Sequence, residues 1–212
     1  MIRIVIADDH TIVREGLKQL LGGAGDLQVI AEAADGHQAL ERVRCLEFEV
    51  LLLDMSMPGK SGIDLIRQVH AEKPRLRVLV LSMHEEHQYA VRAIRAGAAG
   101  YLTKESASAQ LVAAIRKVAA GGAFISAEVA QQLALSAMPG ARALPHEALS
   151  DREFQVFRMI AEGKSVSDIA ERLSLSVKTV STHKANVLHK MAMGTTADLV
   201  RYAITNRLIE GD

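Results

Sequence analysis

The sequence of 212 residues has a single cysteine, no excess of either charge and no long apolar run. One cysteine, Cys45, cannot form an intrachain disulfide, which excludes a small secreted domain held together by disulfides. No stretch of about 18 consecutive apolar residues is present, so no membrane-spanning helix is predicted. The pattern of a secretion signal, a charged start followed by a short apolar core, is also absent. We therefore expect a cytoplasmic protein without a membrane partner.

Basic and acidic residues balance, with 25 Lys and Arg against 25 Asp and Glu. No overall charge excess therefore indicates nucleic acid, a membrane or an acidic substrate, and any such partner must be bound by a local patch. The chain is 49% hydrophobic and 24% charged, which is ordinary for a globular protein and excludes a disordered or collagen-like chain. Domains usually contain about 100 to 150 residues, so a chain of 212 residues is long enough for two modest domains.

Short apolar runs alternate with helical patterns over the first 120 residues. The runs are Ile2 to Ala7, Gln28 to Ala33, Val50 to Leu53, Val78 to Leu81 and Ala99 to Leu102. The segments with helical periodicity are Ile12 to Leu21, Gly36 to Leu46, Gly62 to Glu72, Glu86 to Ala96 and Ala107 to Ala120. The third and fourth runs are continuously apolar, as in parallel strands covered on both faces. With right-handed crossovers, this pattern predicts an α/β doubly wound, five-stranded parallel sheet.

The pattern changes after residue 120. Two of the four prolines lie between Met138 and Pro145, which indicates a linker over residues 121–145, with a short helix at Ser126 to Ala137. No strand pattern follows, and Ser150 with Glu153 forms a capping box that starts a helix. The expected helices are Asp151 to Glu162, Val166 to Leu173, Val177 to Met191 and Thr195 to Asn206. We therefore predict a second, smaller all-α domain over residues 146–212.

Polar side chains follow four of the five predicted strands. Asp8 and Asp9 follow the first strand, Asp54 the third, Ser82 the fourth and Lys104 the fifth. Because the carboxyl ends of parallel strands meet at one edge of a sheet, we expect these side chains to lie close together. Three carboxylates in one place cannot all stay ionised unless cations compensate them, and Lys104 supplies one charge. Oxygen ligands favour Mg²⁺, so a magnesium site is predicted at this edge.

Simpler roles exist for each of these residues and for others nearby. A single Asp at the end of a strand more often caps the next helix, but five polar residues at matching strand ends favour a binding site. His10, His84 and His87 show no metal-ligand spacing, so we expect them to be solvated or packed in the core. Cys45 lies on a predicted helix, where we expect it to contribute packing.

The first 120 residues resemble the receiver domain of two-component response regulators. The resemblance is carried by Asp8-Asp9, Asp54, Met57-Pro58, Gly62, Ser82, Tyr101 and Thr103-Lys104. It implies the flavodoxin-like strand order 2-1-3-4-5 and a phosphoacceptor, Asp54, which receives a phosphoryl group from a sensor histidine kinase. The implied Mg²⁺ ligands are Asp8, Asp9, Asp54 and the main-chain carbonyl of Ser56.

The resemblance also implies a switch. Lys104 and the metal would hold the phosphoryl oxygens while Asp54 supplies the nucleophile, and Ser82 would then bind one of these oxygens. Tyr101 would rotate inward into the space that the movement of Ser82 opens. The alternative for Tyr101 is that it simply packs against the edge of the sheet.

The second domain has helix-turn-helix spacing. Ala170 is small where two helices must cross, and Leu175 and Val180 are suited to anchor the turn. From Lys178 to Lys190 there are three lysines and no carboxylate, although residues 146–212 contain nine basic and nine acidic residues. Charge alone therefore favours a solvated helix face over a DNA-binding surface.

The wider sequence resembles the LuxR-type helix-turn-helix. The matching segments are Leu149-Ser150-Asp151-Arg152-Glu153, Ile160-Ala161-Glu162-Gly163, Ile169-Ala170, Leu175-Ser176, Lys178-Thr179-Val180, His183 and Lys190-Met191. Joined to a receiver, this domain is typical of the NarL/FixJ class of response regulators. The implied DNA-binding residues are Lys178, Thr179, Ser181, Thr182, Lys184, Ala185 and Lys190. Ser181 and Ala185 cannot make a bidentate contact with guanine, so discrimination would rest partly on DNA shape or on Lys184.

The implied function is that of a phosphorylation-regulated transcription factor that binds double-stranded promoter DNA as a homodimer. Leu199, Tyr202 and Ala203 of the last helix are suited to the dimer contact, and RNA polymerase stays open as a further partner. Such a protein is not an enzyme beyond assisting its own phosphorylation and dephosphorylation. One alternative is a phosphatase of the haloacid-dehalogenase kind, which requires a second Asp where this chain has Ser56. Another is a receiver that dimerises constitutively without phosphate.

Overall fold

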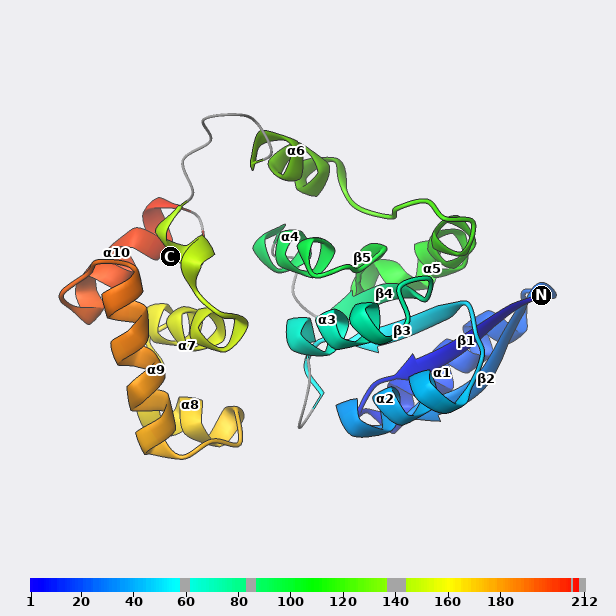
Figure 1. Cartoon of the computed structure of the whole chain (residues 1–212), viewed down its shortest axis with the longest axis horizontal. Coiled ribbons are helices and arrows are strands. Elements are labelled where there is room, and N and C mark those ends of the chain that lie inside the picture. Colours follow the sequence, from blue (N-terminus) through cyan, green and yellow to red (C-terminus); the bar gives the residue numbers. More distant parts are fainter. Residues whose placement is uncertain (58–61, 83–86, 137–143, 207, 210–212) are drawn as a thin grey trace. The chain divides into compact units, whose positions relative to one another are not determined.

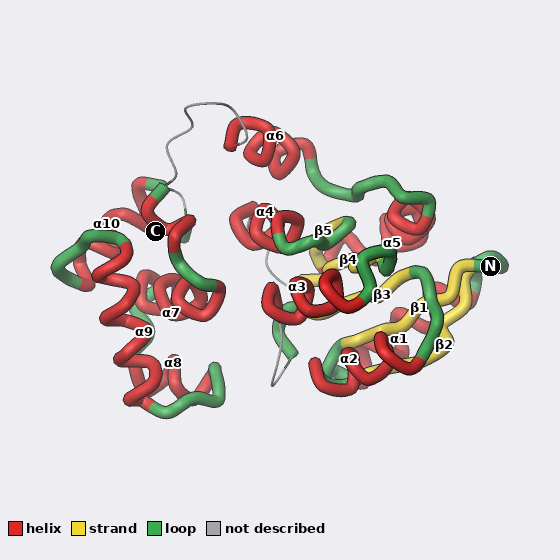
Figure 2. The backbone as a smooth tube through the Cα atoms, in the orientation of Figure 1, coloured by secondary structure: helices red, strands yellow, loops and turns green. Residues whose placement is uncertain are grey.

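The structure is a computed structural model and describes residues 1–57, 62–82, 87–136, 144–206 and 208–209. The chain divides into two units, Met1–Ala134 and Leu135–Asp212, which are described separately. Strands occur in the first unit, and the described elements of the second are all helical (Figure 2). Within the described ranges, no helix combines the length and the apolar character that crossing a membrane requires.

Five parallel strands form one sheet in the first unit (Figure 1). They are β1 (Ile2–Ala7), β2 (Leu27–Ala33), β3 (Val50–Asp54), β4 (Arg77–Ser82) and β5 (Gly100–Thr103). Their order is β2-β1-β3-β4-β5, which confirms the predicted fold class. From β1 the chain passes to β2 on one side, and from β3 it continues to β4 and β5 on the other side, so the strand order reverses between β1 and β3. A ligand is expected in the crevice beyond the carboxyl ends of these two strands.

Helices cover both faces of this sheet. One face packs against α1 (Thr11–Gly22) and α5 (Lys104–Ala119), the other against α2 (Gly36–Cys45), α3 (Gly62–Glu72) and α4 (His87–Arg95). Side chains alternate between the two faces along a strand, so Leu52 packs toward α1 and α5 while Leu51 and Leu53 pack toward the other helices. All five residues of β3 are buried, which explains its continuous apolar sequence.

One expected helix boundary and one expected packing role differ from the structure, and one expected boundary lies outside the described residues. The fifth helix begins at Lys104 rather than Ala107, because the Thr103 hydroxyl accepts a hydrogen bond from the Ser106 N–H at 3.2 Å and caps the helix. The fourth was expected from Glu86, which with His84 and Pro58 lies outside the described residues. Cys45 does not pack as expected, since it is exposed at the last position of α2.

Part of the expected linker packs on the first unit. The carbonyl of Phe124 accepts a hydrogen bond from the Tyr101 N–H at 2.9 Å, and the Phe124 N–H donates to Ala99 at 3.0 Å. Helix α6 (Ala127–Ser136) follows, and its Val129 is 3% exposed within the same core as Tyr101. Gly100 permits this contact, because a Cβ there would lie 2.9 Å from the Phe124 carbonyl oxygen. Residues 121–134 therefore belong to the first unit.

Between residues 144 and 206, the second unit contains a short 3-10 helix and four α-helices. They are η1 (Pro145–Ala148), α7 (Asp151–Ala161), α8 (Val166–Arg172), α9 (Val177–Lys190) and α10 (Thr196–Thr205). Ser150 and Glu153 form the expected capping box at the start of α7. Phe154 and Phe157 are 1% and 0% exposed and lie at the centre of the core.

The residues expected at a dimer contact on α10 serve this core instead. Leu199 and Ala203 are fully buried. The Tyr202 hydroxyl lies 2.8 Å from Nδ1 of the buried His146, so it connects α10 to η1. The apolar periodicity of α10 marks the face that packs within the unit, because a domain this small needs every apolar helix face for its own core. A dimer contact through α10 must use the opposite face.

Candidate functional site

Acidic side chains converge beyond the carboxyl ends of β1 and β3. Asp8 directly follows β1 and Asp54 is the last residue of β3, and both are 1% exposed. The ammonium of Lys104, at the start of α5, lies 2.7 Å from Asp8 Oδ2 and 3.2 Å from Asp54 Oδ2. Three elements that are far apart in sequence thus bring two buried carboxylates and one cation into contact.

The loop after β1 adds Asp9 and His10 to this group. Possible ligand atoms of Asp8, Asp9, His10 and Asp54 all lie within 4.8 Å of one another. The His10 side chain is 62% exposed, as expected for a solvated histidine, but its Nδ1 is 2.9 Å from Asp9 Oδ1. Sequence reasoning missed this position because His10 has no partner at metal-ligand spacing along the chain.

The electrostatics of the site are unbalanced. Burial raises the pKa of Asp54, and the Asp8 charge adds to this effect, while Lys104 and a 3.3 Å hydrogen bond from the Ser56 N–H oppose it. Burial lowers the pKa of Lys104, but the hydrogen bond to Asp8 and the two carboxylate charges outweigh burial, so the net pKa is raised. Lys104 therefore stays an ammonium, and one positive charge faces several carboxylates.

Two carboxylate oxygens in this site lack a hydrogen-bond donor. Asp9 Oδ1 and Asp54 Oδ2 are buried and accept no hydrogen bond from any described residue, although Asp54 Oδ2 is ion-paired with Lys104 and Asp9 Oδ1 lies 2.9 Å from Nδ1 of His10. Buried acceptors without donors are rare and indicate a ligand that supplies positive charge. Oxygen donors at this spacing suit a hard divalent cation, so the residues fit the magnesium ion that the sequence predicts.

Ser82 and Tyr101 lie on the strands next to the acidic group. Ser82 is the last residue of β4 and is 1% exposed, and β4 pairs directly with β3. Tyr101 is 9% exposed and packs in the core that includes Val129 of α6. A cavity of about 390 Å³ lies beside it, between β5, α5 and the segment around Phe124. The ring is thus already inside, where it contacts the core that α6 helps to form.

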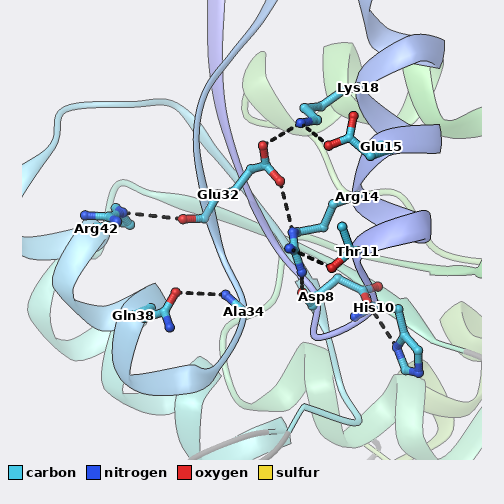
Figure 3. A network of polar contacts seen from close by, with 10 residues as sticks. All are labelled: Asp8, His10, Thr11, Arg14, Glu15, Lys18, Glu32, Ala34, Gln38 and Arg42. Atoms are coloured by element: carbon cyan, nitrogen blue, oxygen red, sulfur yellow. Dashed lines mark hydrogen bonds and ion pairs between the residues drawn. The ribbon is translucent and has the colours of Figure 1, made fainter.

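Arg14 contacts the acidic loop and was missed by sequence reasoning (Figure 3). Its Nη1 donates to the main-chain carbonyl of Asp8 at 2.7 Å, and its Nε donates to Glu32 of β2 at 2.9 Å. Lys18 donates to the same carboxylate at 2.7 Å. Opposite charges on a helix and a neighbouring strand were visible in the sequence. The sequence alone, however, does not tell which residues of α1 face which residues of β2.

The helix-turn-helix is formed by α8 and α9. Ile169 and Ala170 of α8 and Val180 and Val187 of α9 are buried, which fixes the two helices against each other. The Ser176 hydroxyl caps α9 by accepting a hydrogen bond from the Thr179 N–H at 3.0 Å. The opposite face of α9 is therefore free of the core and available for a partner.

The seven implied DNA-binding residues all lie on α9. Lys178, Ser181, Thr182, Ala185 and Lys190 are exposed, and Thr179 and Lys184 are half-buried. The hydroxyls of Ser181 and Thr182 donate to carbonyls of their own helix, at 2.9 and 3.0 Å, so they present acceptor lone pairs outward. Lys190 differs from the others because it donates to the buried Glu153 at 2.7 Å.

Comparisons with known proteins cover both units. A model of the response regulator receiver domain matches residues 4–116, and a model of bacterial regulatory proteins of the luxR family matches residues 147–203. Response regulator GacA of Pseudomonas aeruginosa is 36% identical over 211 residues, which is 99% of each chain. Response regulator UvrY of Escherichia coli K12 is 35% identical over 213 residues, which is 100% of this chain and 98% of UvrY.

Solved structures resemble the chain over most of its length. RcsB of Salmonella enterica serovar Typhimurium, bound to the promoter rprA in the presence of the phosphomimetic BeF₃⁻, gives a TM-score of 0.63 at 27% identity. The similarity covers 95% of this chain and 97% of the RcsB chain. A LuxR-family response regulator from Aurantimonas sp. SI85-9A1 is 37% identical over 63% of this chain, with a TM-score of 0.59.

Proposed function

The chain belongs to the response regulators that join a receiver domain to a LuxR-type helix-turn-helix domain, and we propose from this that it is a transcription factor controlled by phosphorylation of Asp54. The observation that carries the proposal is the buried Asp54 carboxylate, whose Oδ2 accepts no hydrogen bond from a described residue and lies 3.2 Å from the Lys104 ammonium. This oxygen is ready to attack an electrophile that the ammonium also attracts.

The proposed reaction moves a phosphoryl group from a phosphohistidine of a sensor kinase to Asp54. An Oδ atom of Asp54 forms the new P–O bond while the P–N bond breaks, and the imidazole leaves with the electron pair of that bond. The raised pKa of Asp54 makes its carboxylate a better nucleophile than an ordinary one. Lys104 donates hydrogen bonds to the phosphoryl oxygens and so helps to hold the phosphorus in line between the Asp54 oxygen and the leaving imidazole nitrogen.

Asp8, Asp9 and Asp54 are proposed to hold Mg²⁺, with the main-chain carbonyl of Ser56 as a further ligand. The support is the pair of buried oxygens without donors, on Asp9 and Asp54. When bound, the ion supplies the positive charge that Lys104 alone does not provide, and it neutralises the phosphoryl oxygens.

The phosphoryl signal is proposed to pass through Ser82 and Tyr101 to the segment after α5. Ser82 is the last residue of the strand that pairs with the strand of Asp54, and it would donate its hydroxyl to a phosphoryl oxygen. Tyr101 shares a core with Val129 of α6, so a movement of the ring changes the packing of the segment that leads to the second unit. We assign residues 1–134 to the receiver, residues 135–144 to the linker and residues 145–212 to the DNA-binding domain.

The exposed face of α9 is proposed to enter the major groove of promoter DNA. The support is the spacing and exposure of its residues and the similarity of the chain to RcsB, whose structure was solved bound to promoter DNA. A single helix with a few phosphate contacts binds weakly, so the protein is proposed to act as a homodimer. The dimer contact on α10 is assigned to its outer face, which carries Ile204 at 49% exposure.

Labelling with a small phosphodonor tests the proposal. Wild-type protein incubated with radiolabelled acetyl phosphate and Mg²⁺ should be labelled, and Asp54→Asn should not. Asp64→Asn is the matched control, because Asp64 is 62% exposed on neighbouring α3 and touches none of the site residues. Phosphorylation should raise affinity for the protein's own promoter DNA by roughly 5- to 150-fold in a footprint titration. Label that persists in Asp54→Asn would refute the assignment.

A further inference from the structure

Arg14 connects the acidic loop to strand β2. Its guanidinium donates to three oxygens: the Asp8 main-chain carbonyl at 2.7 Å, Glu32 at 2.9 Å and the Thr11 hydroxyl at 3.3 Å. The side chain is 13% exposed and points between α1 and β2 (Figure 3). It touches the loop through its main chain and not through a carboxylate, so it acts on the position of the loop.

The carboxylate that anchors Arg14 is itself fixed. Glu32 accepts hydrogen bonds from both Arg14 and Lys18, and Lys18 is also held by Glu15 at 2.7 Å. These bonds lower the pKa of Glu32, so the anchor stays ionised. Arg14 therefore has a charged partner on the edge strand β2, and the hydrogen bond it makes to the loop is well oriented.

The carbonyl that Arg14 binds belongs to the peptide between Asp8 and Asp9. This peptide is planar, so fixing its oxygen restricts ψ of Asp8 and φ of Asp9 together. The other side of Asp8 is fixed as well, because its N–H donates to the Ala33 carbonyl at 3.1 Å. With both ends of Asp8 bound to β2 and Arg14, the backbone is held where the carboxylates of Asp8 and Asp9 lie beside Asp54.

We propose that Arg14 is a positioning residue for the divalent cation and for phosphorylation of Asp54, because it fixes the peptide that sets the directions of Asp8 and Asp9. The proposal rests on the proposed function, since it concerns the same cation. Residues that orient metal ligands from outside typically change metal affinity by about 10- to 100-fold when they are removed. A loss of this size is expected for the Mg²⁺ affinity of Arg14→Met.

Charge and position predict opposite results for this substitution. Arg14 is a cation near an acidic site, so removing it should by charge alone tighten the binding of a second cation. If Arg14 acts by position, removing it should weaken binding. Lys18→Met is the matched control. It also removes a positive charge that is paired with Glu32, but Lys18 has no hydrogen bond to Asp8.

Isothermal titration of the full chain with MgCl₂ measures the effect. Arg14→Met should bind Mg²⁺ at least about 10-fold more weakly than wild type. Lys18→Met should bind it equally well or more tightly. Arg14→Lys should lie between wild type and Arg14→Met, because an ammonium keeps the charge but not the fork that joins Glu32 to the Asp8 carbonyl. Circular dichroism checks that each variant is folded.

The Mg²⁺ dependence of labelling gives a second readout. The Mg²⁺ concentration for half-maximal labelling should rise in Arg14→Met, while the rate at saturating Mg²⁺ stays close to that of wild type. General damage to the fold would lower both. Should Arg14→Met not fold, Arg14→Lys carries the same test with a smaller expected loss.

Three results would overturn the role of Arg14. The first is unchanged or tighter Mg²⁺ binding by either Arg14 variant. The second is a loss of Mg²⁺ affinity in Lys18→Met that equals the loss in Arg14→Met. The third is a lower labelling rate of Arg14→Met at saturating Mg²⁺ without a change in the Mg²⁺ concentration for half-maximal labelling. Failure of the proposed function gives a different result. Wild-type protein would then show no Mg²⁺ binding, or the Asp54→Asn variant would still be labelled.

Discussion

Replacing Asp54 with asparagine should stabilise the first unit while it removes the phosphoacceptor. Asp54 is 1% exposed, and burial together with the Asp8 charge raises the pKa of its carboxyl. A pKa that is higher in the folded state means that ionisation opposes folding. Asparagine keeps the shape of the side chain without the charge, so the opposing contribution disappears at neutral pH.

The expected size follows from the contacts of the carboxylate. Asp54 Oδ2 is buried and accepts no hydrogen bond from a described residue, and its ion pair with Lys104 is 3.2 Å long. A buried polar atom without a hydrogen bond costs about 1 to 3 kcal/mol and a charged one costs more, so the neutral amide of asparagine, which stays buried, should recover a charge penalty of about 1 to 3 kcal/mol. Lys104 keeps its shorter 2.7 Å contact with Asp8 in the variant. At roughly 4 °C per kcal/mol for a unit of this length, Tm should rise by about 4 to 12 °C.

Scanning calorimetry of the full chain in EDTA, at a series of pH values, measures this effect. The free energy by which the ionised Asp54 carboxylate destabilises the folded state is fully present above the folded-state pKa. It is lost as the pH falls through that pKa. The difference in Tm between Asp54→Asn and wild type should therefore shrink as the pH is lowered from 7 toward the ordinary pKa of 3.8. Asp64→Asn, at an exposed position, should leave Tm within about 2 °C. An Asp54→Asn protein no more stable than wild type would refute the reasoning.

Three further substitutions test other parts of the molecule. Lys184→Ala should weaken DNA binding and reduce the salt slope by about 0.9, and an unchanged slope in a salt titration would remove Lys184 from the phosphate contacts. Ser150→Ala should destabilise the second unit by about 1 kcal/mol in denaturant unfolding, whereas Ser150→Asp, which retains a cap, should not. Gly100→Ala places a Cβ 2.8 Å from Leu79 Cδ1 and 2.9 Å from the Phe124 carbonyl oxygen, so the Phe124 segment must move. Faster hydrogen exchange at the Tyr101 amide should report this, and unchanged exchange would contradict it.

The strands and their polar ends could be predicted from the sequence because both depend on local patterns. A continuous apolar run such as Val50–Asp54 has few stable environments other than a strand covered on both faces. Parallel order then brings the residue after each strand to the same edge without any knowledge of side-chain packing. Asp8, Asp54 and Lys104 are close together for this reason, although Lys104 is 96 residues from Asp8 in the chain.

Contacts that depend on register between elements could not be predicted in this way. The Arg14 bond to Glu32 requires the rotation of α1 against β2, which the sequence leaves undetermined. The expectation for Leu199 and Ala203 failed for a related reason. An apolar helix face indicates only that it is buried, and the same pattern fits burial within one chain or between two chains. The structure shows that α7 and η1 use this face.

The neutral charge of the second unit, which argued against DNA on the sequence alone, has a local explanation. Acids that form caps and ion pairs at helix ends are Glu153, Glu162, Asp168 and Asp198. Hydrogen bonds or nearby cations hold the pKa of each below its ordinary value, so these charges are committed within the domain. No described carboxylate forms an ion pair with Lys178 or Lys184. The total charge therefore includes acids that the α9 face does not present, and it is the charge of this face that decides whether DNA binds.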